Sequence, residues 1–486
     1  MTPEAALLAA LATPVVGAGV IAALDRAPNL REAATLLSAA VLFTFVLLVA
    51  GAVLAGGRPS VSLFEMMPGL ALRFEVEPLG MLFALIASGL WIVNSIYSIG
   101  YMRANGEAHQ TRFYVCFAAA LASVIGIAFA GNLLTLFLFY EALTLVTYPL
   151  VTHAGTDEAR RAGRVYLGIL VSTSIALLLV AIIWTFEIAG SIDFRKGGLF
   201  SADTGRTTLT VLLALYVFGI GKAAVMPVHR WLPAAMVAPT PVSALLHAVA
   251  VVKAGVFCVV KVVVYVLGVD TLAEVGAATW LPFVAGFTIL AASIVALRSD
   301  NLKRRLAYST VSQLSYVVLA AALLAPLSIL GAALHIAAHA VSKITLFFAA
   351  GAIYTAAHKT EVSQLAGIGR AMPVTMTAFA IGALSLIGIP PAVGFMSKWF
   401  IVQGAVDAGH YVALGVIVLS TLLNAAYFLP IVHSAFFRAP VDDGHSAHHG
   451  EAPWPMVTAL AITAALTLVL FFVADVPLRL AAQLVD

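Results

Sequence analysis

Long apolar stretches, each close to the length that crosses a lipid bilayer, limit this chain more than any other feature of its sequence. About 20 consecutive apolar residues make a transmembrane helix. Lipid offers the backbone no hydrogen bonds, so such stretches cross as helices. Fourteen spans are predicted, at residues 5–24, 33–55, 79–101, 113–130, 133–152, 164–188, 207–225, 240–267, 276–297, 305–324, 327–356, 373–390, 411–437 and 454–484. We therefore expect an all-α polytopic membrane protein.

The composition supports this class. Of 486 residues, 62% are hydrophobic and 10% are charged, whereas soluble domains carry about 25% charged residues. The net charge of +3 gives no basic surface for a nucleic acid. Cys116 and Cys258 both fall in apolar stretches, which excludes a disulfide framework or a zinc site and predicts buried free thiols. The first apolar stretch lacks the basic flank and cleavage site of a signal peptide, so it is expected to be a retained helix.

Lysines and arginines are divided unequally between the two sides. Of 26, fifteen lie in loops after odd-numbered spans, six lie on the opposite side and five lie within spans. Cytoplasmic loops carry the excess of basic residues. The sequence therefore predicts a multi-pass protein of the plasma membrane. Because fourteen is even, both termini are expected on the extracytoplasmic side.

Two of the spans contain proline-rich interruptions. The seventh is predicted to break at MPVHRWLP and to continue as a short helix near 227–237, and the twelfth at IGIPPAVGFMSKWF, continuing near 392–406. Broken helices five spans apart are typical of inverted transporter repeats. We predict the following divisions: helices one to three with an extracellular hairpin (1–112), a first five-helix repeat (113–269), a second inverted repeat (270–438), and a loop with helix fourteen (439–486).

Ionisable residues inside the spans are the candidate functional groups. A charge at the bilayer centre costs about 2.5–3.5 kcal/mol on the most lenient scale, so each ionisable residue in a span is a candidate for a functional role. Glu141 is the one carboxylate placed deep in a predicted span, and Lys222 precedes the break in the seventh. Burial and an opposite charge act on protonation in opposite senses, so a Glu141–Lys222 pair is a tunable proton site. The alternatives are a packing carboxylate and an immobile ion pair.

Further candidates follow along the chain. Lys253 lies in the middle of the eighth span, too far from either interface to snorkel, whereas Lys261 is near the span end and is expected to snorkel. His247 is six residues from Lys253, on a different helix face, and a packing role competes with a functional one. Lys398 follows the second break, where an interfacial lysine is the alternative.

His335, His339 and Lys343 are spaced at i, i+4 and i+8 in LHIAAHAVSKITLF. This spacing places them on one face of a helix. The unperturbed histidine pKa of about 6.5 suits proton relay near neutral pH. Buried packing histidines are the alternative.

Other motifs carry no chemistry. Gly17, Gly19 and Ala22 match a dinucleotide fingerprint loosely but have no strand before them, and Gly221–Lys222 lacks the rest of a phosphate loop. Two cysteines cannot hold an iron–sulfur cluster. The histidine-rich loop 441–450 is at most an adventitious metal binder. We expect no cofactor and no metal.

Several segments together resemble a known family: FYEALTLVTYPL, KAAVMPVHRWLPAAMVAPTPVSALLHAVAVVKAG, LKRRLAYSTVSQLSY, HIAAHAVSKITLFFAAG and GIPPAVGFMSKWF. They are similar to the proton-translocating, antiporter-like subunits of respiratory complex I, membrane-bound hydrogenases and Mrp-type cation/proton antiporters. The length resembles the D-type subunit of the Mrp antiporters. The resemblance implies fourteen helices with inverted repeats, a glutamate–lysine pair (Glu141, Lys222), a central lysine (Lys253), polar residues of the eleventh helix (His335, His339, Lys343) and an exit-side lysine (Lys398).

The expected function is proton translocation within a multisubunit cation/proton antiporter that exchanges Na+ or K+ for H+. Protons would pass from the cytoplasm along mid-membrane lysines and histidines to the outside. The expected partners are other membrane subunits, the lipid bilayer, protons and Na+ or K+, with no nucleic acid. Two alternatives stay open: the pump subunit of a redox-driven complex, and an energy-coupling subunit for inorganic carbon uptake.

Overall fold

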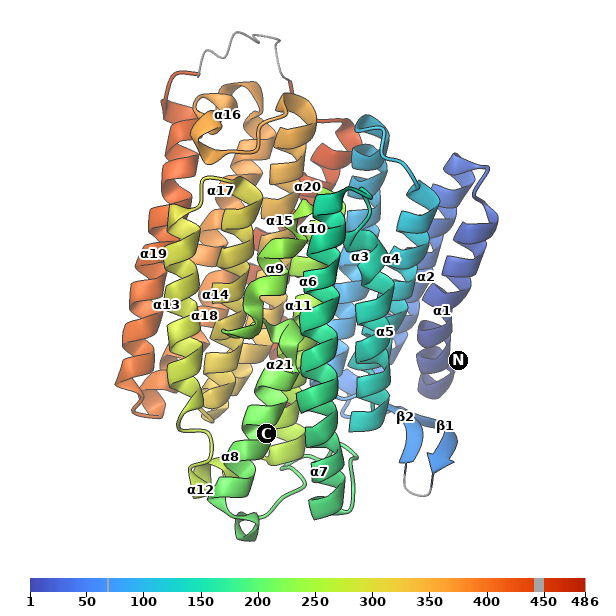
Figure 1. Cartoon of the computed structure of the whole chain (residues 1–486), viewed down its shortest axis with the longest axis vertical. Helices are drawn as coiled ribbons and strands as arrows, with labels where there is room; N and C mark the ends of the chain where they lie inside the picture. The colour runs from blue at the N-terminus through green and yellow to red at the C-terminus, as the bar shows by residue number, and fades with distance from the viewer. Residues whose placement is uncertain (68–69, 441–449, 486) are drawn as a thin grey trace.

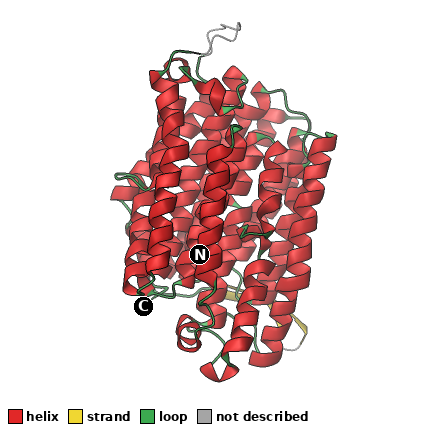
Figure 2. Cartoon of the chain, turned by 60° about the vertical axis from the view of Figure 1, so that its left-hand side comes forward, coloured by secondary structure: helices red, strands yellow, loops and turns green. Residues whose placement is uncertain are grey.

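The computed structural model describes residues 1–67, 70–440 and 450–485, apart from the side chains of residues 66–67 and 246–247. It is a bundle of helices that run roughly along one direction, with one two-stranded sheet at one end (Figure 1, Figure 2). The predicted all-α membrane architecture is confirmed.

The first part of the chain forms α1 (Pro3–Ala23), α2 (Pro28–Leu54), β1 (Ser60–Met67), β2 (Leu70–Glu75), α3 (Pro78–Ala104), α4 (Gln110–Ala128), α5 (Leu133–Val151), α6 (Asp157–Thr173), η1 (Ser174–Leu178), α7 (Leu179–Ala189), η2 (Ala202–Thr204), α8 (Arg206–Gly219), η3 (Gly221–Ala223), η4 (Val228–Arg230), α9 (Trp231–Ala234), η5 (Ala235–Val237), α10 (Thr240–Ala244), η6 (Leu245–Val249), α11 (Val251–Val262), η7 (Val263–Leu267) and α12 (Val269–Val275). The second part forms α13 (Leu281–Arg298), α14 (Leu302–Ala322), α15 (Pro326–Ala357), η8 (Val362–Leu365), α16 (Ile368–Ala371), α17 (Pro373–Ile387), α18 (Val393–Asp407), α19 (Tyr411–Phe437), α20 (Trp454–Phe472) and α21 (Asp475–Ala482).

Local sequence explains where several helices begin. The side chain of Asn132 accepts a hydrogen bond from Thr135 N (2.8 Å), and that of Asn301 accepts one from Arg304 N (3.0 Å). Each satisfies a backbone donor that the first helical turn leaves free. Prolines occupy the first turn of α1, α2, α3, α13, α15, α17 and α20, where the missing amide costs nothing.

The predicted hairpin is present as antiparallel β1 and β2, with Ser60 opposite Glu75. It is fixed to the loop between α4 and α5, because Asn132 Nδ2 donates to Ala71 O (2.8 Å) and Phe74 forms a bridge with Ala130. The start of α1 and the helix α21 lie toward this end of the bundle (Figure 1). We refer to it as the hairpin end.

The centre of the bundle is α15, a 32-residue helix whose apolar stretch is entirely buried. It packs against α3, α14, α17, α18 and α20. Tyr97 of α3 stacks on Phe348 (ring centroids 3.9 Å apart) and donates to its carbonyl oxygen (2.9 Å). A Cβ at Gly351 would lie 2.2 Å from the Tyr97 hydroxyl, so a glycine permits this close approach.

Ten helices of the described chain are long and apolar enough to cross a membrane, or eleven if a pair bent by 75° counts as one span. The predicted count of fourteen is therefore not confirmed by this criterion. Some predicted spans consist of shorter helices here. In particular, α8 has 14 residues and α17 has 15, because the chain breaks after each of them.

Three boundaries differ from prediction. The seventh helix ends at Gly219, before the prolines rather than at them. The predicted span 240–267 is interrupted by the π-helical turn η6 and by Ala250 (φ −108°, ψ −77°). The last span divides into α20 and α21. Apolarity marks where chain is buried, but it does not show where backbone hydrogen bonds are interrupted.

Candidate functional site: a buried row of lysines and histidines

The lysines and histidines that we predicted as functional residues, apart from His247, have buried side chains. Their exposed fractions are 0% for Lys222, Lys253, Lys343 and His339, 1% for His335 and 6% for Lys398. Groups of this kind remain buried only where partners satisfy them. Glu141 is half-buried. His247 belongs to η6, but its side chain lies outside the described residues.

Lys222 lies within the helix break rather than before it. After α8 ends, the chain makes the short turn η3, and Ala224 adopts a left-handed conformation (φ 55°). Trp231 Nε1 donates to Gly221 O (3.0 Å) and closes the turn. A Cβ at Gly255 would lie 2.2 Å from Ala223 N. The backbone of α11 therefore packs directly on the turn that carries the lysine.

The ammonium of Lys222 is bound by α5. It donates to Tyr140 O (2.8 Å) and to Thr144 Oγ1, and it lies 3.2 Å from the centroid of the Tyr140 ring. No ion pair joins it to Glu141 among the described residues. Glu141 Oε1 is buried without a hydrogen-bond partner. The expected Glu141–Lys222 pair is thus absent as a direct contact, because the next residue on the helix points about 100° away.

Lys253 contacts His339 directly. Its Nζ is within hydrogen-bonding distance of Nδ1, across the interface between α11 and α15. An ammonium group can only donate, so Nδ1 accepts and the neutral ring carries its proton on Nε2. The two residues can therefore exchange one proton over one hydrogen bond.

His335 continues the row toward α18. Its ring centroid is 6.1 Å from that of His339. Nδ1 lies 2.9 Å from Ser397 Oγ, and Nε2 lies 3.1 Å from Gln313 Oε1. Both ring nitrogens of this buried histidine therefore have partners. The imidazole is held in one orientation.

Lys398 ends the row at the second helix break. Its Nζ donates to Leu386 O (2.8 Å) and Ile387 O (3.1 Å), the last carbonyls of α17. Carbonyls at a helix C-terminus lack intrahelical donors and carry partial negative charge. Gln313 Nε2 also reaches Leu386 O, at 3.4 Å. One carbonyl therefore links the partner of His335 to Lys398.

Lys343 forms a side branch. Its Nζ donates to Ser309 Oγ (2.9 Å), which also accepts from the Tyr427 hydroxyl (3.1 Å). Eight residues rotate a helical position by about 80° relative to the first. Lys343 contacts α14, where Ser309 lies next to Tyr427 of α19, while His335 contacts both α14 and α18. His335 and Lys343 therefore both face α14, and only His335 also reaches α18.

The prediction for Lys261 was wrong. The side chain does not snorkel; it is fully buried, with Nζ 3.1 Å from Glu77 Oε1 and donating to Ala130 O (2.9 Å). The Glu77 carboxylate also accepts from Leu79 N and Gly80 N at the start of α3. The sequence does contain a signal for this helix cap: the carboxylate of Glu77 directly precedes Pro78, the first residue of α3.

Sequence reasoning missed the neutral partners of the row: Tyr140, Thr144, Ser309, Gln313 and Ser397. Polar side chains inside apolar spans were the signal, since such groups hydrogen-bond between helices. Serine and threonine are frequent in membrane helices, so the pattern does not select these positions.

No group of three His, Cys, Asp or Glu residues in the described part of the chain is arranged to hold a metal ion. Cys116 and Cys258 are both free thiols, but only Cys258 is buried as predicted, because Cys116 is partly exposed. Residues 441–449 of the histidine-rich loop lie outside the described residues.

Comparison with known proteins places this geometry in context. Residues 130–424 match the family described as "NADH:quinone oxidoreductase/Mrp antiporter, TM". The chain is 32% identical over 431 residues to NADH-quinone oxidoreductase subunit N of Desulforudis audaxviator, covering 84% of each protein. It is 31% identical to a probable K(+)/H(+) antiporter subunit, of type A/B, from Rhizobium meliloti, covering 80% of this chain but 39% of that protein.

Solved structures give the same fold. A chain of the Mrp complex from Dietzia sp. DQ12-45-1b superposes with a TM-score of 0.88 at 22% identity, covering 100% of this chain and 97% of that one. A chain of the membrane-bound sulfane sulfur reductase, an archaeal respiratory membrane complex, superposes with a TM-score of 0.86 at 21% identity, covering 99% and 98%.

Proposed function

Because this chain belongs to the NADH:quinone oxidoreductase/Mrp antiporter transmembrane family, we propose that its buried row of lysines and histidines carries protons across the membrane. The chain is an antiporter-like, proton-translocating subunit, and its relatives are subunits of hetero-oligomeric complexes.

One observation carries the assignment of residues. From Lys253 through His339 and His335 to Lys398, successive groups share hydrogen bonds, a ring contact of 6.1 Å and one common carbonyl acceptor. A single buried lysine would be explained by packing. Four titratable groups in sequence, drawn from α11, α15 and α18, supply successive nitrogen atoms that can bind and release a proton.

The physical driving force is electrostatic coupling. Two like charges a few ångströms apart in a medium of low polarity repel each other by several kcal/mol. Adding a proton at one end of the row therefore favours losing one further along, and the groups titrate together. Lys222, held at the first helix break, contributes to the same field without a hydrogen bond to Lys253 among the described residues.

We propose cation/proton antiport, Na+ or K+ against H+, as the setting of this transfer, with proton uptake from the cytoplasm and release outside. The match to a K(+)/H(+) antiporter subunit and the fold shared with the Mrp complex support the setting. The excess of basic residues in loops after odd-numbered predicted spans supports the orientation, with both termini outside the plasma membrane.

A redox-driven proton pump is the second candidate. The relative that matches over 84% of its own length is a subunit of NADH-quinone oxidoreductase. In such a complex the same row would be driven by electron transfer in other subunits. The subunits that co-purify with this chain distinguish the two settings.

Lys253→Ala tests the residue assignment. The complex that contains the variant is reconstituted in proteoliposomes, and proton movement is followed with a pH-sensitive dye. We expect normal assembly and loss of proton translocation, while Lys196→Ala, at an exposed lysine near the hairpin end, behaves as wild type. If an assembled Lys253→Ala complex translocates protons at the wild-type rate, Lys253 does not carry the proton and the proposal is refuted.

A further inference from the structure

A cavity of about 360 Å³ opens on the face of the bundle opposite the hairpin end. Its polar lining includes Tyr101, Glu107, Lys303, Tyr354 and Thr240. A water molecule occupies about 30 Å³ in the liquid, so a polar cavity of this size accommodates several. It leads from the loop between α3 and α4 to the beginning of α10.

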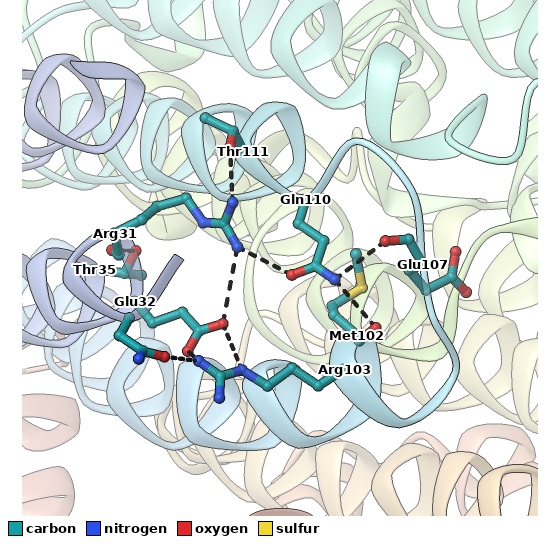
Figure 3. Close-up of polar contacts among 9 residues, drawn as sticks. Arg31, Glu32, Thr35, Met102, Arg103, Glu107, Gln110 and Thr111 are labelled. Atoms are coloured by element: carbon teal, nitrogen blue, oxygen red, sulfur yellow. Dashed lines mark hydrogen bonds and ion pairs between the residues drawn. The ribbon is translucent and has the colours of Figure 1, made fainter. Parts of the chain in front are cut away.

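Glu107 lies at the rim of this cavity on a loop that is held in place. Gln110 Nε2 donates to Glu107 O (3.1 Å), and Gln110 Oε1 accepts from Arg31 Nη2 (3.0 Å). Glu32 pairs with Arg103 and completes the support. Figure 3 shows this network on one side of the loop and the Glu107 carboxylate pointing away from it. The side chain is thus presented to the cavity from a fixed backbone.

His153 lies beside this carboxylate. Its Nε2 is 3.8 Å from Glu107 Oε2, and its side chain is 2% exposed. Burial lowers the pKa of His153 to about 4, and the Arg112 guanidinium acts in the same direction. Burial raises the pKa of Glu107, while Lys303 opposes this. The charged and titratable groups around the pair are Tyr101, His109, Arg112, Lys303, Tyr354 and Lys359.

The floor of the cavity adjoins the segment that carries Lys253. Thr240 begins α10, which continues through η6 into α11. Lys303 Nζ donates to Ala238 O (2.6 Å) and fixes the segment that leads into α10. The cavity therefore ends at the interrupted helix that contains Lys253, 13 residues beyond Thr240.

We propose that Glu107, with His153 beside it, is the proton-collecting group through which the buried row is loaded from this face. The inference rests on the proposed function and extends it to a site outside the membrane-buried row. The Glu107 carboxylate takes a proton from bulk water and passes it to water in the cavity, which regenerates the carboxylate. The neutral ring of His153 beside the acid adds no positive charge that would oppose its protonation.

The experiment compares Glu107→Gln, Glu107→Asp and His153→Gln in the reconstituted complex, with Lys253→Ala run in parallel. Proton uptake is measured from pH 6 to pH 8.5 at low and high buffer concentration. We expect Glu107→Gln to slow uptake at least 5-fold at pH 8, where protons are scarce, and less at pH 6. Glu107→Asp should retain most of the rate. High concentrations of a small buffer should restore Glu107→Gln, because mobile carriers then replace the side chain.

Glu158→Gln is the matched control, since Glu158 is an exposed carboxylate at the start of α6 on the same face. A Glu107→Gln complex that takes up protons like wild type at every pH, while Lys253→Ala is inactive, overturns this inference and leaves the proposed function intact. A loss that buffer does not relieve also overturns it, because it indicates a structural role. Wild-type uptake by both Lys253→Ala and Glu107→Gln removes both proposals.

Discussion

The Nζ atom of Lys253 in α11 lies within hydrogen-bonding distance of Nδ1 of His339 in α15, and both side chains are completely buried. The two residues are 86 positions apart in the sequence. At this contact the row passes from the interrupted eighth span to the central helix. It therefore joins the parts of the chain that we predicted as the first and second repeats.

A double-mutant cycle on this contact tests whether the two residues act together. We expect Lys253→Met and His339→Gln each to lower proton translocation by more than 10-fold, and the double variant to be no slower than the worse single one. Groups that act as one unit show such non-additive losses. Independent, multiplicative losses in the reconstituted complex would contradict a shared transfer step.

Gln313 orients His335, and Gln313→Leu should reveal this. The substitution leaves the buried Nε2 of His335 without its acceptor, which costs about 1–3 kcal/mol for an unsatisfied buried group. We expect about a 10-fold slower proton transfer in vesicles. Ser315→Ala on the same helix is the control, because its buried hydroxyl has no hydrogen-bond partner among the described residues. Equal rates for both variants would refute the orienting role.

Gly255 keeps α11 against the turn that holds Lys222. An alanine Cβ would approach Ala223 N to 2.2 Å, and overpacking of this kind costs about 1–3 kcal/mol. We predict that Gly255→Ala lowers the thermal denaturation midpoint of the purified complex and slows translocation. Gly168→Ala, where nothing lies within 4 Å of the added carbon, should leave both unchanged. If Gly255→Ala changes neither the denaturation midpoint nor translocation, the turn can move away from the added methyl group without cost.

Glu77 and Lys261 form a structural ion pair, with 3.1 Å between Lys261 Nζ and Glu77 Oε1. Breaking a buried pair by removing one partner destabilises a protein by about 3–5 kcal/mol. We expect Lys261→Met to lower the denaturation midpoint strongly, and Glu77→Gln with Lys261→Met to recover much of the loss, because glutamine still accepts from Leu79 N. The assembled double variant should transport protons at the wild-type rate. Lost transport in that variant would place the pair on the proton path.

His153 should remain neutral under mildly acidic conditions. Its pKa in the folded chain is lowered to about 4, against about 6.5 for an unfolded chain. The unfolded state therefore binds more protons between these values, and stability falls as the pH drops from about 6.5 to about 4. His153→Gln should reduce this acid sensitivity. NMR chemical shifts of the imidazole nitrogens, assigned to His153 with the same variant, measure its protonation. A His153 ring that is protonated at pH 6 would contradict the lowered pKa.

The membrane class, most helix positions and the location of the titratable residues could be predicted from sequence. Residues 327–356 were expected as one span and α15 runs from Pro326 to Ala357. The piece expected near 392–406 is α18, from Val393 to Asp407. These predictions succeed because the cost of exposing apolar chain to water, or a charge to lipid, depends on residue type alone.

The partners of each charge required the tertiary structure. Lys261 and Lys253 are equally buried lysines of one helix, yet one pairs with the cap of α3 and the other with a histidine of α15. Glu141 and Lys222 were expected to pair, but Tyr140 and Thr144 bind the ammonium instead. Sequence determined that titratable groups would lie inside this membrane protein, because hydropathy is a local property. Which of them exchange a proton was decided by the packing of helices distant in sequence, since a hydrogen bond depends on distances of a few tenths of an ångström.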